Sequence, residues 1–213
     1  MILPTTFYAR DTRLVARELL GQRLVCHDAA SGARLAGIIV ETEAYLADDP
    51  ACHAFRGETP RNRAMFGPPG TLYVYQIYNH YFCVNVVSNR VGVGEAVLLR
   101  ALEPTRGVEL MVERRNAAYK VGFERYRDLR VDASTPKGLR SLTNGPAKLT
   151  TAMGFQMRVH NGVSLSKRSE SCVFVRKRVH NAPMVATTRI GIREGVELPY
   201  RFYLEGNAFV SRK

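Results

Sequence analysis

Three polar side chains stand in stretches of sequence that are otherwise typical of buried strands. Glu43, Asn85 and Arg100 each interrupt a run of apolar and β-branched residues. Burying a carboxylate, an amide or a guanidinium is costly unless each group finds a partner. The simplest arrangement is that the three side chains meet one another, or meet a ligand, in one pocket.

A second carboxylate, Glu41, lies on the same strand face as Glu43 and Tyr45, because side chains alternate between the two faces of a strand. Two carboxylates at this spacing suit a general acid–base pair, a set of metal ligands or an exposed sheet edge. Spacing alone does not separate these possibilities. The arginine at position 100 favours a site, since a guanidinium would keep one carboxylate charged and oriented.

Aromatic side chains crowd the hairpin predicted between these strands. Tyr73 and Tyr75 share one face of its first strand, and Tyr78 falls in the turn. An aromatic stripe is usually core, but an aromatic residue at a turn tip also suits a wedge between base pairs. His53, in the polar connection before the hairpin, suits a catalytic base, a stacking surface or an ordinary surface histidine.

Basic residues stand near the starts of two predicted short helices. Arg61 and Arg63 belong to the first, and Lys148 follows the Gly-Pro opening of the second. The free amide groups at a helix N-terminus favour phosphate, as do basic side chains beside them. These residues therefore suit contacts to a phosphate backbone, although a solvated basic turn would look the same.

Apolar periodicity and turn residues predict the elements that must position these side chains. Helices are predicted over 12–20, 59–66, 107–115 and 144–154, and strands over 23–26, 34–45, 71–77, 81–87, 96–102, 173–175, 188–192 and 201–204. Glu103 and Pro104 are expected to end the strand that carries Arg100. Residues 116–143 are polar and basic, which predicts a surface loop region.

Composition limits the class of protein. The chain has 213 residues, 46% of them hydrophobic, which predicts one domain over residues 1–213. A formal net charge of +12 favours an anionic partner, although it is also compatible with a solubility charge. We find no apolar run near the roughly 20 residues of a membrane helix and no signal peptide. Four cysteines without framework spacing predict reduced thiols in a cytoplasmic compartment, and a lone His80–Cys83 spacing does not predict a metal site.

Five motifs together resemble one family. They are VETEAY (40–45), TPRNR (59–63), PGTLYVY (69–75), YFCVN (81–85) and LLRALEP (98–104). Their types and order resemble the alkyladenine (3-methyladenine) DNA glycosylase family. The resemblance runs from ARELLG (16–21) through NGPAKL (144–149) to RFY (201–203), and so covers nearly the whole chain.

The resemblance implies an α+β fold, a single mixed domain with a curved, mainly antiparallel β-sheet flanked by helices. It implies a DNA repair enzyme that excises alkylated or deaminated purines from duplex DNA without a metal or organic cofactor. The expected purines are 3-methyladenine and 7-methylguanine, with hypoxanthine and ethenoadenine as further candidates. The protein is expected to be a cytoplasmic monomer that associates with the nucleoid by binding DNA.

The resemblance also implies roles for the residues in the motifs. Glu43 would activate the attacking water, and Arg100 would orient its carboxylate. Three side chains would line the pocket around the flipped base, namely Tyr45, His53 and Tyr75. Asn85 would lie beside the purine edge, and Tyr78 would be the intercalating wedge. No lysine falls inside the pocket motifs, so a water-using enzyme without strand cleavage is expected.

Two other classes of protein stay compatible with the sequence. One is a nucleic-acid-binding module that has kept the scaffold and lost catalysis. It would bind DNA that contains a lesion without forming product, and the pairing of Glu43 with Arg100 argues against it. The other is an RNA-directed binding or processing protein, which charge and tyrosines alone would allow. Competition between duplex DNA and structured RNA would separate it.

Overall fold

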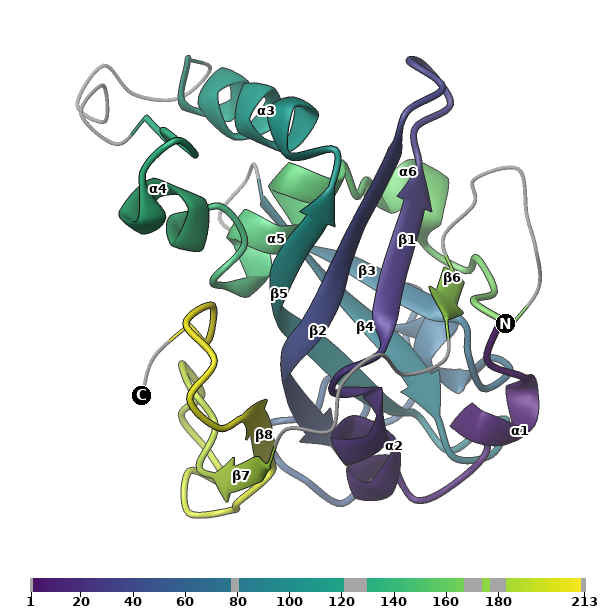
Figure 1. Ribbon diagram of the computed structural model, residues 1–213. Coiled ribbons are helices and arrows are strands. Elements are labelled where there is room, and N and C mark those ends of the chain that lie inside the picture. The colour runs from purple at the N-terminus through teal and green to yellow at the C-terminus, as the bar shows by residue number, and fades with distance from the viewer. Residues whose placement is uncertain (1, 78–80, 121–129, 167–173, 177–182, 212–213) are drawn as a thin grey trace.

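The computed structural model describes residues 2–77, 81–120, 130–166, 174–176 and 183–211. These residues form an α+β arrangement in which helices surround an open antiparallel sheet (Figure 1). The strands are β1 (Arg23–His27), β2 (Arg34–Tyr45), β3 (Leu72–Ile77), β4 (Tyr81–Ser88), β5 (Glu95–Arg106), β6 (Phe174–Arg176), β7 (Met184–Thr187) and β8 (Arg201–Leu204). The helices are α1 (Thr5–Tyr8), α2 (Thr12–Leu19), α3 (Val108–Lys120), α4 (Pro136–Ser141), α5 (Pro146–Met153), α6 (Met157–His160) and the 3₁₀ turn η1 (Arg63–Phe66).

Strand β2 is the centre of the sheet. The strand order is β3-β4-β5-β2-β1-β6, with β8 paired to β2 and β7 paired to β8. One edge of β2 pairs with β5 along its length, while the other edge pairs first with β1 and then, at Glu41 to Glu43, with β8. Figure 1 shows β7 and β8 beside the end of β2 that lies away from β1. Register shifts next to Glu41 bend β2 locally at this point.

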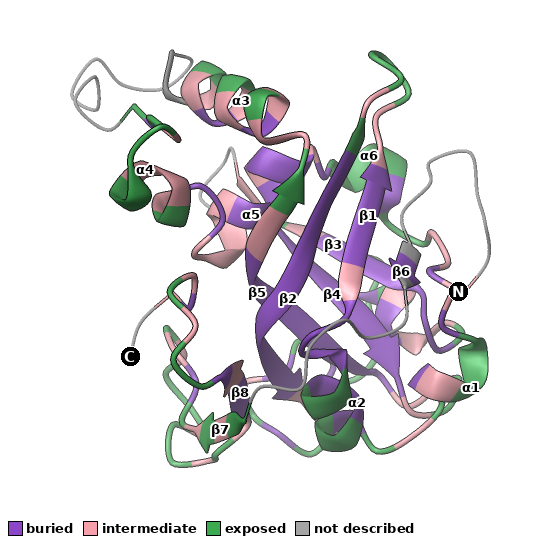
Figure 2. Ribbon diagram, viewed as in Figure 1, coloured by how far each residue is buried: buried purple, intermediate pink, exposed green. Residues whose placement is uncertain are grey.

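The core explains why these segments form strands. Apolar side chains on β2, β4 and β5 pack against α2 and α5, and Figure 2 shows these strands buried over most of their length. Asp11 begins α2 by accepting hydrogen bonds from the backbone of Arg13 and Leu14, as a helix cap does. Gly21 then ends the helical segment with a φ of 77°, which favours glycine. The predicted helix, stop and following hairpin are therefore confirmed.

Strand β5 is longer than predicted. It continues through Glu103 and Pro104 to Arg106, so the expected end at these residues was wrong. Pro104 lies opposite Gly37, beside a register shift in β2. A side chain at Gly37 would place its Cβ 2.9 Å from the carbonyl oxygen of Glu103. The glycine and the bulge make room for the proline within the pair.

The predicted loop over 116–143 also contains helix. Helix α3 continues to Lys120, beyond the predicted end at residue 115, and α4 occupies Pro136–Ser141. Thr135 begins α4 by accepting a hydrogen bond from the Gly138 amide, and Pro136 takes the first helical position. The prediction of a loop rested on the polar and basic composition of this region and overlooked the helix-start residues Thr135 and Pro136.

Two further predicted elements differ from the structure. The helix over 59–66 is only the short turn η1, because Asn62 organises the preceding residues instead. The Asn62 side chain accepts hydrogen bonds from Thr59 and donates to the carbonyls of His53 and Gly57. The strand over 188–192 is absent, since β7 ends at Thr187 and the following residues form a loop.

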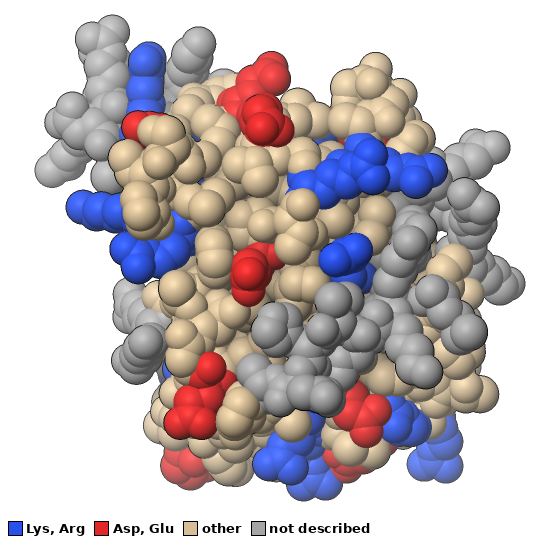
Figure 3. Space-filling view, in the orientation of Figure 1, with Lys and Arg blue, Asp and Glu red and all other residues tan. Residues whose placement is uncertain are grey.

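Strands β1, β2, β3, β4, β6 and β8 lie close to their predicted bounds, whereas β7 was not predicted. No helix of the described segments is long and apolar enough to cross a membrane. On the face shown in Figure 3, basic and acidic side chains of the described residues are interspersed. Net charge therefore does not by itself mark a nucleic-acid surface on that face.

Candidate active site

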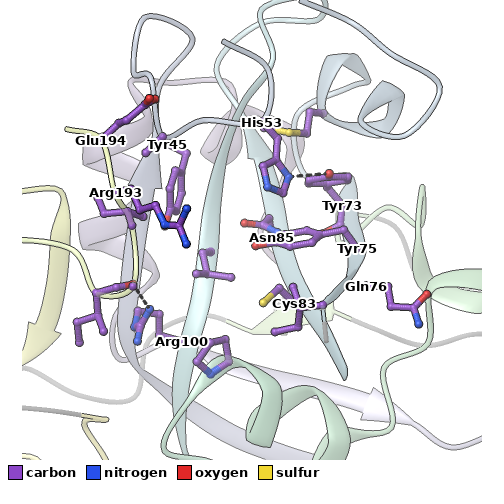
Figure 4. Close-up of a pocket in the computed structure, with 18 of the residues that line it drawn as sticks. Tyr45, His53, Tyr73, Tyr75, Gln76, Cys83, Asn85, Arg100, Arg193 and Glu194 are labelled. Carbon is purple, nitrogen blue, oxygen red and sulfur yellow. Dashed lines mark hydrogen bonds between the residues drawn. The ribbon is translucent and has the colours of Figure 1, made fainter. Parts of the chain in front are cut away.

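A cavity of about 800 Å³ opens beside the end of β2, between β3, β4, β5 and the loop after β7. Arg100 and Tyr45 lie on one side of it, and His53, Tyr75 and Asn85 lie on the other (Figure 4). These side chains come from segments that are far apart in the sequence. The sheet register brings them together, because Asn85 on β4 pairs with β5 and β5 pairs with β2.

Glu43 lies directly behind this cavity, with no exposed surface. Its Oε1 is 3.1 Å from Nη1 of Arg100 and accepts a hydrogen bond of 2.8 Å from the Ile190 amide. The Tyr45 hydroxyl donates to Oε2 over 2.9 Å. Three donors, one of them charged, therefore fix the orientation of a buried carboxylate. The predicted meeting of Glu43 and Arg100 is confirmed.

Glu41 is equally buried but serves a different set of partners. Its Oε1 lies 3.1 Å from Nε of Arg100, 2.7 Å from Nε of Arg201 and 2.9 Å from Oγ of Ser211. Its Oε2 accepts a hydrogen bond of 2.7 Å from the Ser211 amide. Two carboxylates and two guanidiniums thus balance within one buried network, as buried charges require. The possibility of an exposed sheet edge is excluded for both glutamates.

The two carboxylates therefore differ in what they can reach. Arg100 turns its Nε toward Glu41 and its Nη1 toward Glu43, and it also lines the cavity. The three partners of Glu43 all line the cavity, namely Arg100, Tyr45 and Ile190. Glu41 instead contacts Arg201 on β8 and Ser211 in the C-terminal segment, in addition to Arg100. The arrangement favours one carboxylate for chemistry and a second that holds the arginine in place.

The opposite wall consists of aromatic rings. Nδ1 of His53 lies 3.0 Å from the Tyr73 hydroxyl. The centroid of the His53 ring lies 4.5 Å from the centroid of the Tyr75 ring. Tyr73 and Tyr75 stack with centroids 5.3 Å apart. Burial raises the pKa of Tyr73 to about 12 and raises the pKa of Tyr75 further. These hydroxyls therefore stay neutral at physiological pH, so the wall presents uncharged ring faces.

Asn85 lines the same cavity as Arg100, which agrees with the second arrangement that the sequence allowed, a shared pocket for a ligand. Among the described residues, no hydrogen bond joins its side chain to Glu43 or Arg100. Its side-chain amide donates to the backbone carbonyl of Tyr73 over 3.2 Å. This bond uses one donor of the amide, so the amide oxygen is not needed for it and can accept from a ligand in the cavity.

The pKa of His53 gives a first testable prediction. Burial, and then the positive charge of Arg61, lower this pKa from its ordinary value of 6.5. The unfolded chain therefore binds the proton more readily, and His53 makes the free energy of unfolding fall as the pH drops below about 6.5. We expect an NMR titration to give a His53 midpoint below 6.5 and Arg61→Gln to raise it. A midpoint at or above 6.5 in the parent protein would contradict this placement.

The loop over 188–195 closes the cavity, and sequence reasoning missed it. Arg189 forms a buried ion pair with Asp49 and donates to the carbonyls of Ala44 and Gly195. Its guanidinium also lies 4.7 Å from the ring centroid of Tyr45. One arginine thus joins the loop to the end of β2 and to the segment that carries His53.

Backbone conformation explains why this loop is not the predicted strand. Gly191 and Gly195 have φ values of 80° and 57°, which end any extended ladder. The Ile190 amide bonds to Glu43 instead of a neighbouring strand. The sequence did contain a signal for this loop. Gly191 and Gly195 flank the charged residues Arg193 and Glu194, a pattern that favours a loop over a strand.

The family model described as methylpurine-DNA glycosylase matches residues 6–208. The chain belongs to the methylpurine-DNA glycosylase family. Two relatives carry the name "Putative 3-methyladenine DNA glycosylase" and align over all of both chains. The relative from Carboxydothermus hydrogenoformans is 44% identical over 213 residues, and that from Methanoculleus marisnigri is 45% identical over 219 residues. A similarly named relative from Alkaliphilus oremlandii is 41% identical, again over the full length of both.

The three basic residues predicted to contact phosphate have different surroundings in this member of the family. Arg61 lines it. Arg63 is exposed and lies 3.2 Å from Glu58, so it is already paired at the surface. Lys148 donates to the Asn144 side chain over 2.9 Å, and burial lowers its pKa. Tyr78, the predicted wedge, lies outside the described residues.

Proposed function

We propose that this methylpurine-DNA glycosylase hydrolyses the N-glycosidic bond of damaged purines in duplex DNA. The proposed purines are 3-methyladenine, 7-methylguanine, hypoxanthine and ethenoadenine. The observation that carries the proposal is the Glu43 carboxylate, held 3.1 Å from Arg100 behind a ring-walled cavity of about 800 Å³. A cavity of this size is typical of small-ligand sites and suits a nucleotide.

The proposed chemistry needs one carboxylate. The bond between C1′ and the purine breaks through a transition state with positive charge on the sugar, by analogy with glycoside hydrolysis. A carboxylate near C1′ stabilises that charge and takes a proton from the attacking water. Glu43 is the proposed carboxylate, and Arg100 with the Ile190 amide would hold it in place. Because water attacks and Glu43 activates it, the reaction requires no cofactor.

Access of water to Glu43 requires one movement. The Tyr45 hydroxyl donates to Oε2, and Glu43 has no exposed surface while that bond is present. We propose that the entering nucleotide displaces this hydroxyl and so exposes Oε2 to a water. The other two donors bind Oε1, which would keep the carboxylate oriented during the change.

The aromatic wall suits purines that already carry a positive charge. Alkylation at N3 or N7 makes a purine cationic and a good leaving group, so no acid is needed. Each contact between a cation and a ring face contributes roughly 0.5–2 kcal/mol. Tyr45, Tyr75 and neutral His53 would supply these faces. Asn85 would lie beside the purine edge, where it would crowd the exocyclic amine that guanine carries and adenine lacks. 7-Methylguanine keeps this amine, so its release would depend on the weak glycosidic bond of the cationic base and not on a better fit beside Asn85.

The target nucleotide must leave the base stack before it can enter this cavity. Tyr78 is the proposed wedge that fills the gap, and Arg61, Arg63 and Lys148 are the proposed contacts to the DNA backbone. We expect Tyr78→Ser to weaken binding of lesion-containing duplex by about 1–3 kcal/mol, the range of base–aromatic stacking. Fluorescence anisotropy with lesion and undamaged duplexes measures it. An unchanged affinity for lesion DNA would assign Tyr78 to packing instead.

The proposal includes a monofunctional reaction that leaves an abasic site in an intact strand. Its test uses end-labelled duplexes that each hold one damaged purine. The strand is expected to stay intact after incubation and to break only on treatment with alkali. Breakage without alkali would reject the monofunctional reaction. Tight binding with alkali-stable DNA would favour the alternative of a binding protein that has lost catalysis.

We further propose that residues 1–213 form one domain that acts as a cytoplasmic monomer on nucleoid DNA. The continuous sheet from β1 to β8 supports a single domain, because β8 pairs with the central strand β2. Light scattering at working concentrations tests the monomer, and a mass twice that of the chain would reject it.

A further inference from the structure

Contacts on both sides of Arg193 hold the backbone of the loop over 188–195 at the cavity. On one side of Arg193, the Ile190 amide bonds to Glu43 over 2.8 Å. On the other side, the Gly195 carbonyl accepts from the Arg189 guanidinium over 3.2 Å, and Arg189 is paired with buried Asp49. The residues between these anchors are therefore positioned by buried contacts, although they line the cavity.

Arg193 extends its guanidinium into the cavity, while the carboxylate of Glu194 points away from it (Figure 4). Arg100, the other guanidinium on this side, is compensated by Glu41 and Glu43. Among the residues that the structure describes, neither an ion pair nor a hydrogen bond to Arg193 is present. Its donors are thus free for whatever enters the cavity.

The free charge matters because the proposed substrates fall into two classes. Purines alkylated at N3 or N7 are cationic and leave without help. Hypoxanthine and other neutral lesions build up negative charge on the purine as the glycosidic bond breaks. They need a donor or a positive charge at the leaving base, and neither the neutral tyrosine hydroxyls nor neutral His53 supplies a positive charge. Arg61 also lines the cavity, but its charge acts on His53 at the opposite wall, whereas Arg193 lies on the side of Arg100 and Tyr45.

We propose that Arg193 stabilises neutral leaving purines and biases the cavity against cationic ones, an inference that rests on the proposed glycosylase function. A guanidinium pairs in a bidentate manner with the O6 and N7 acceptors of a purine. Hypoxanthine presents both acceptors. In 7-methylguanine a methyl group blocks N7, and the positive base is repelled by the positive side chain. The substrate class that fits Arg193 is a neutral 6-oxopurine lesion.

The step balances as an ordinary hydrolysis. The water oxygen bonds to C1′ and passes one proton to Glu43. The electron pair of the C1′–N9 bond moves to the purine, where Arg193 donates to O6 and N7 and so stabilises the developing anion. The released purine then takes the proton from Glu43, which restores the carboxylate.

The test compares two lesions in one protein. Single-turnover release is measured from duplexes with hypoxanthine or 7-methylguanine, for the parent protein, Arg193→Gln and Arg193→Lys. Arg193→Gln is expected to slow hypoxanthine release at least tenfold, about 1.4 kcal/mol, and to leave 7-methylguanine release unchanged or faster. Arg193→Lys is expected to restore part of the lost rate, because it keeps the charge without the bidentate geometry.

Arg140→Gln is the matched control, since it removes one positive charge from exposed helix α4. It is expected to leave the ratio of the two rates unchanged. Equal rates for Arg193→Gln and the parent on both lesions would overturn the inference while leaving the glycosylase function intact. An equal fall on both lesions would also overturn it and would assign Arg193 to general DNA binding. If the parent protein releases neither base, the proposed function itself fails.

Discussion

Glu43→Gln is expected to slow release of the damaged base by about 10²- to 10⁴-fold, the usual range for loss of a general acid or base. The substitution removes the group proposed to accept the proton of the water, and with it the negative charge proposed to face the developing sugar cation. The proposed contacts to DNA lie elsewhere, so affinity for lesion-containing duplex should stay within a few-fold. Single-turnover rates and fluorescence anisotropy measure the two quantities separately.

The fold should survive this substitution. A glutamine at position 43 can keep an oxygen toward Arg100 and the Ile190 amide and turn its amide group toward the Tyr45 hydroxyl. Arg100 also keeps its ion pair with Glu41. Glu109→Gln, at an exposed position of α3, is the matched control and should release base at the parent rate. Normal turnover by Glu43→Gln would reject the assigned role.

Arg100→Ala is expected to lower the free energy of unfolding by about 3–5 kcal/mol, the cost of stripping one partner from a buried ion pair. Arg100 contacts both Glu41 and Glu43, whose side chains have no exposed surface. After its removal Arg201 remains near Glu41, but Glu43 keeps only neutral donors. Base release should also fall, because the carboxylate loses its orientation. Urea unfolding followed by circular dichroism measures the stability.

The surface pair of Arg13 with Asp11 offers a control for this prediction. Their side chains are 51% and 46% exposed, so Arg13→Ala should change stability by no more than about 1 kcal/mol. Arg100→Lys keeps the charge but cannot reach both glutamates with the same geometry, and should fall between the two variants. Equal stabilities of Arg100→Ala and Arg13→Ala would show that the buried network contributes little.

The contact between Glu43 and Arg100 could be predicted from the sequence for a physical reason. A charge in an apolar strand has to meet a partner, and the chain offers an arginine in a similar strand. Strand β2 was predicted at its observed bounds because its long apolar run lies between clear turn residues. Alternation then placed Glu41 and Glu43 on one face, where both now contact Arg100.

The rest of the site could not be read from local patterns. Glu41 is held by Arg201 and Ser211, which follow it by 160 and 170 residues. Nothing in strand periodicity indicates which of many arginines reaches a given carboxylate. The Asp49–Arg189 pair is hidden for the same reason, since both residues lie in segments with no regular structure.

Contacts made by backbone amides are a second feature of the site that the sequence does not predict. The Ile190 amide contacts Glu43 because the surrounding loop departs from the extended conformation at Gly191. Every residue except proline carries such an amide, so the sequence does not distinguish this one. A strand was predicted over 188–192, whereas Gly191 and the buried Arg189 favour the observed loop. Because the segment forms a loop instead of a strand, residues 190–194, including Arg193, line one side of the cavity.

Detection of free base is the most direct test of the claim that a Glu43-activated water removes damaged purines. Duplexes that each hold a single damaged purine are incubated with the protein, and the released base is identified by liquid chromatography and mass spectrometry. We expect free damaged purine and an equal amount of abasic site from the parent protein, and far less of both from Glu43→Gln. Duplexes that are bound and then recovered with every damaged base still attached would contradict the claim.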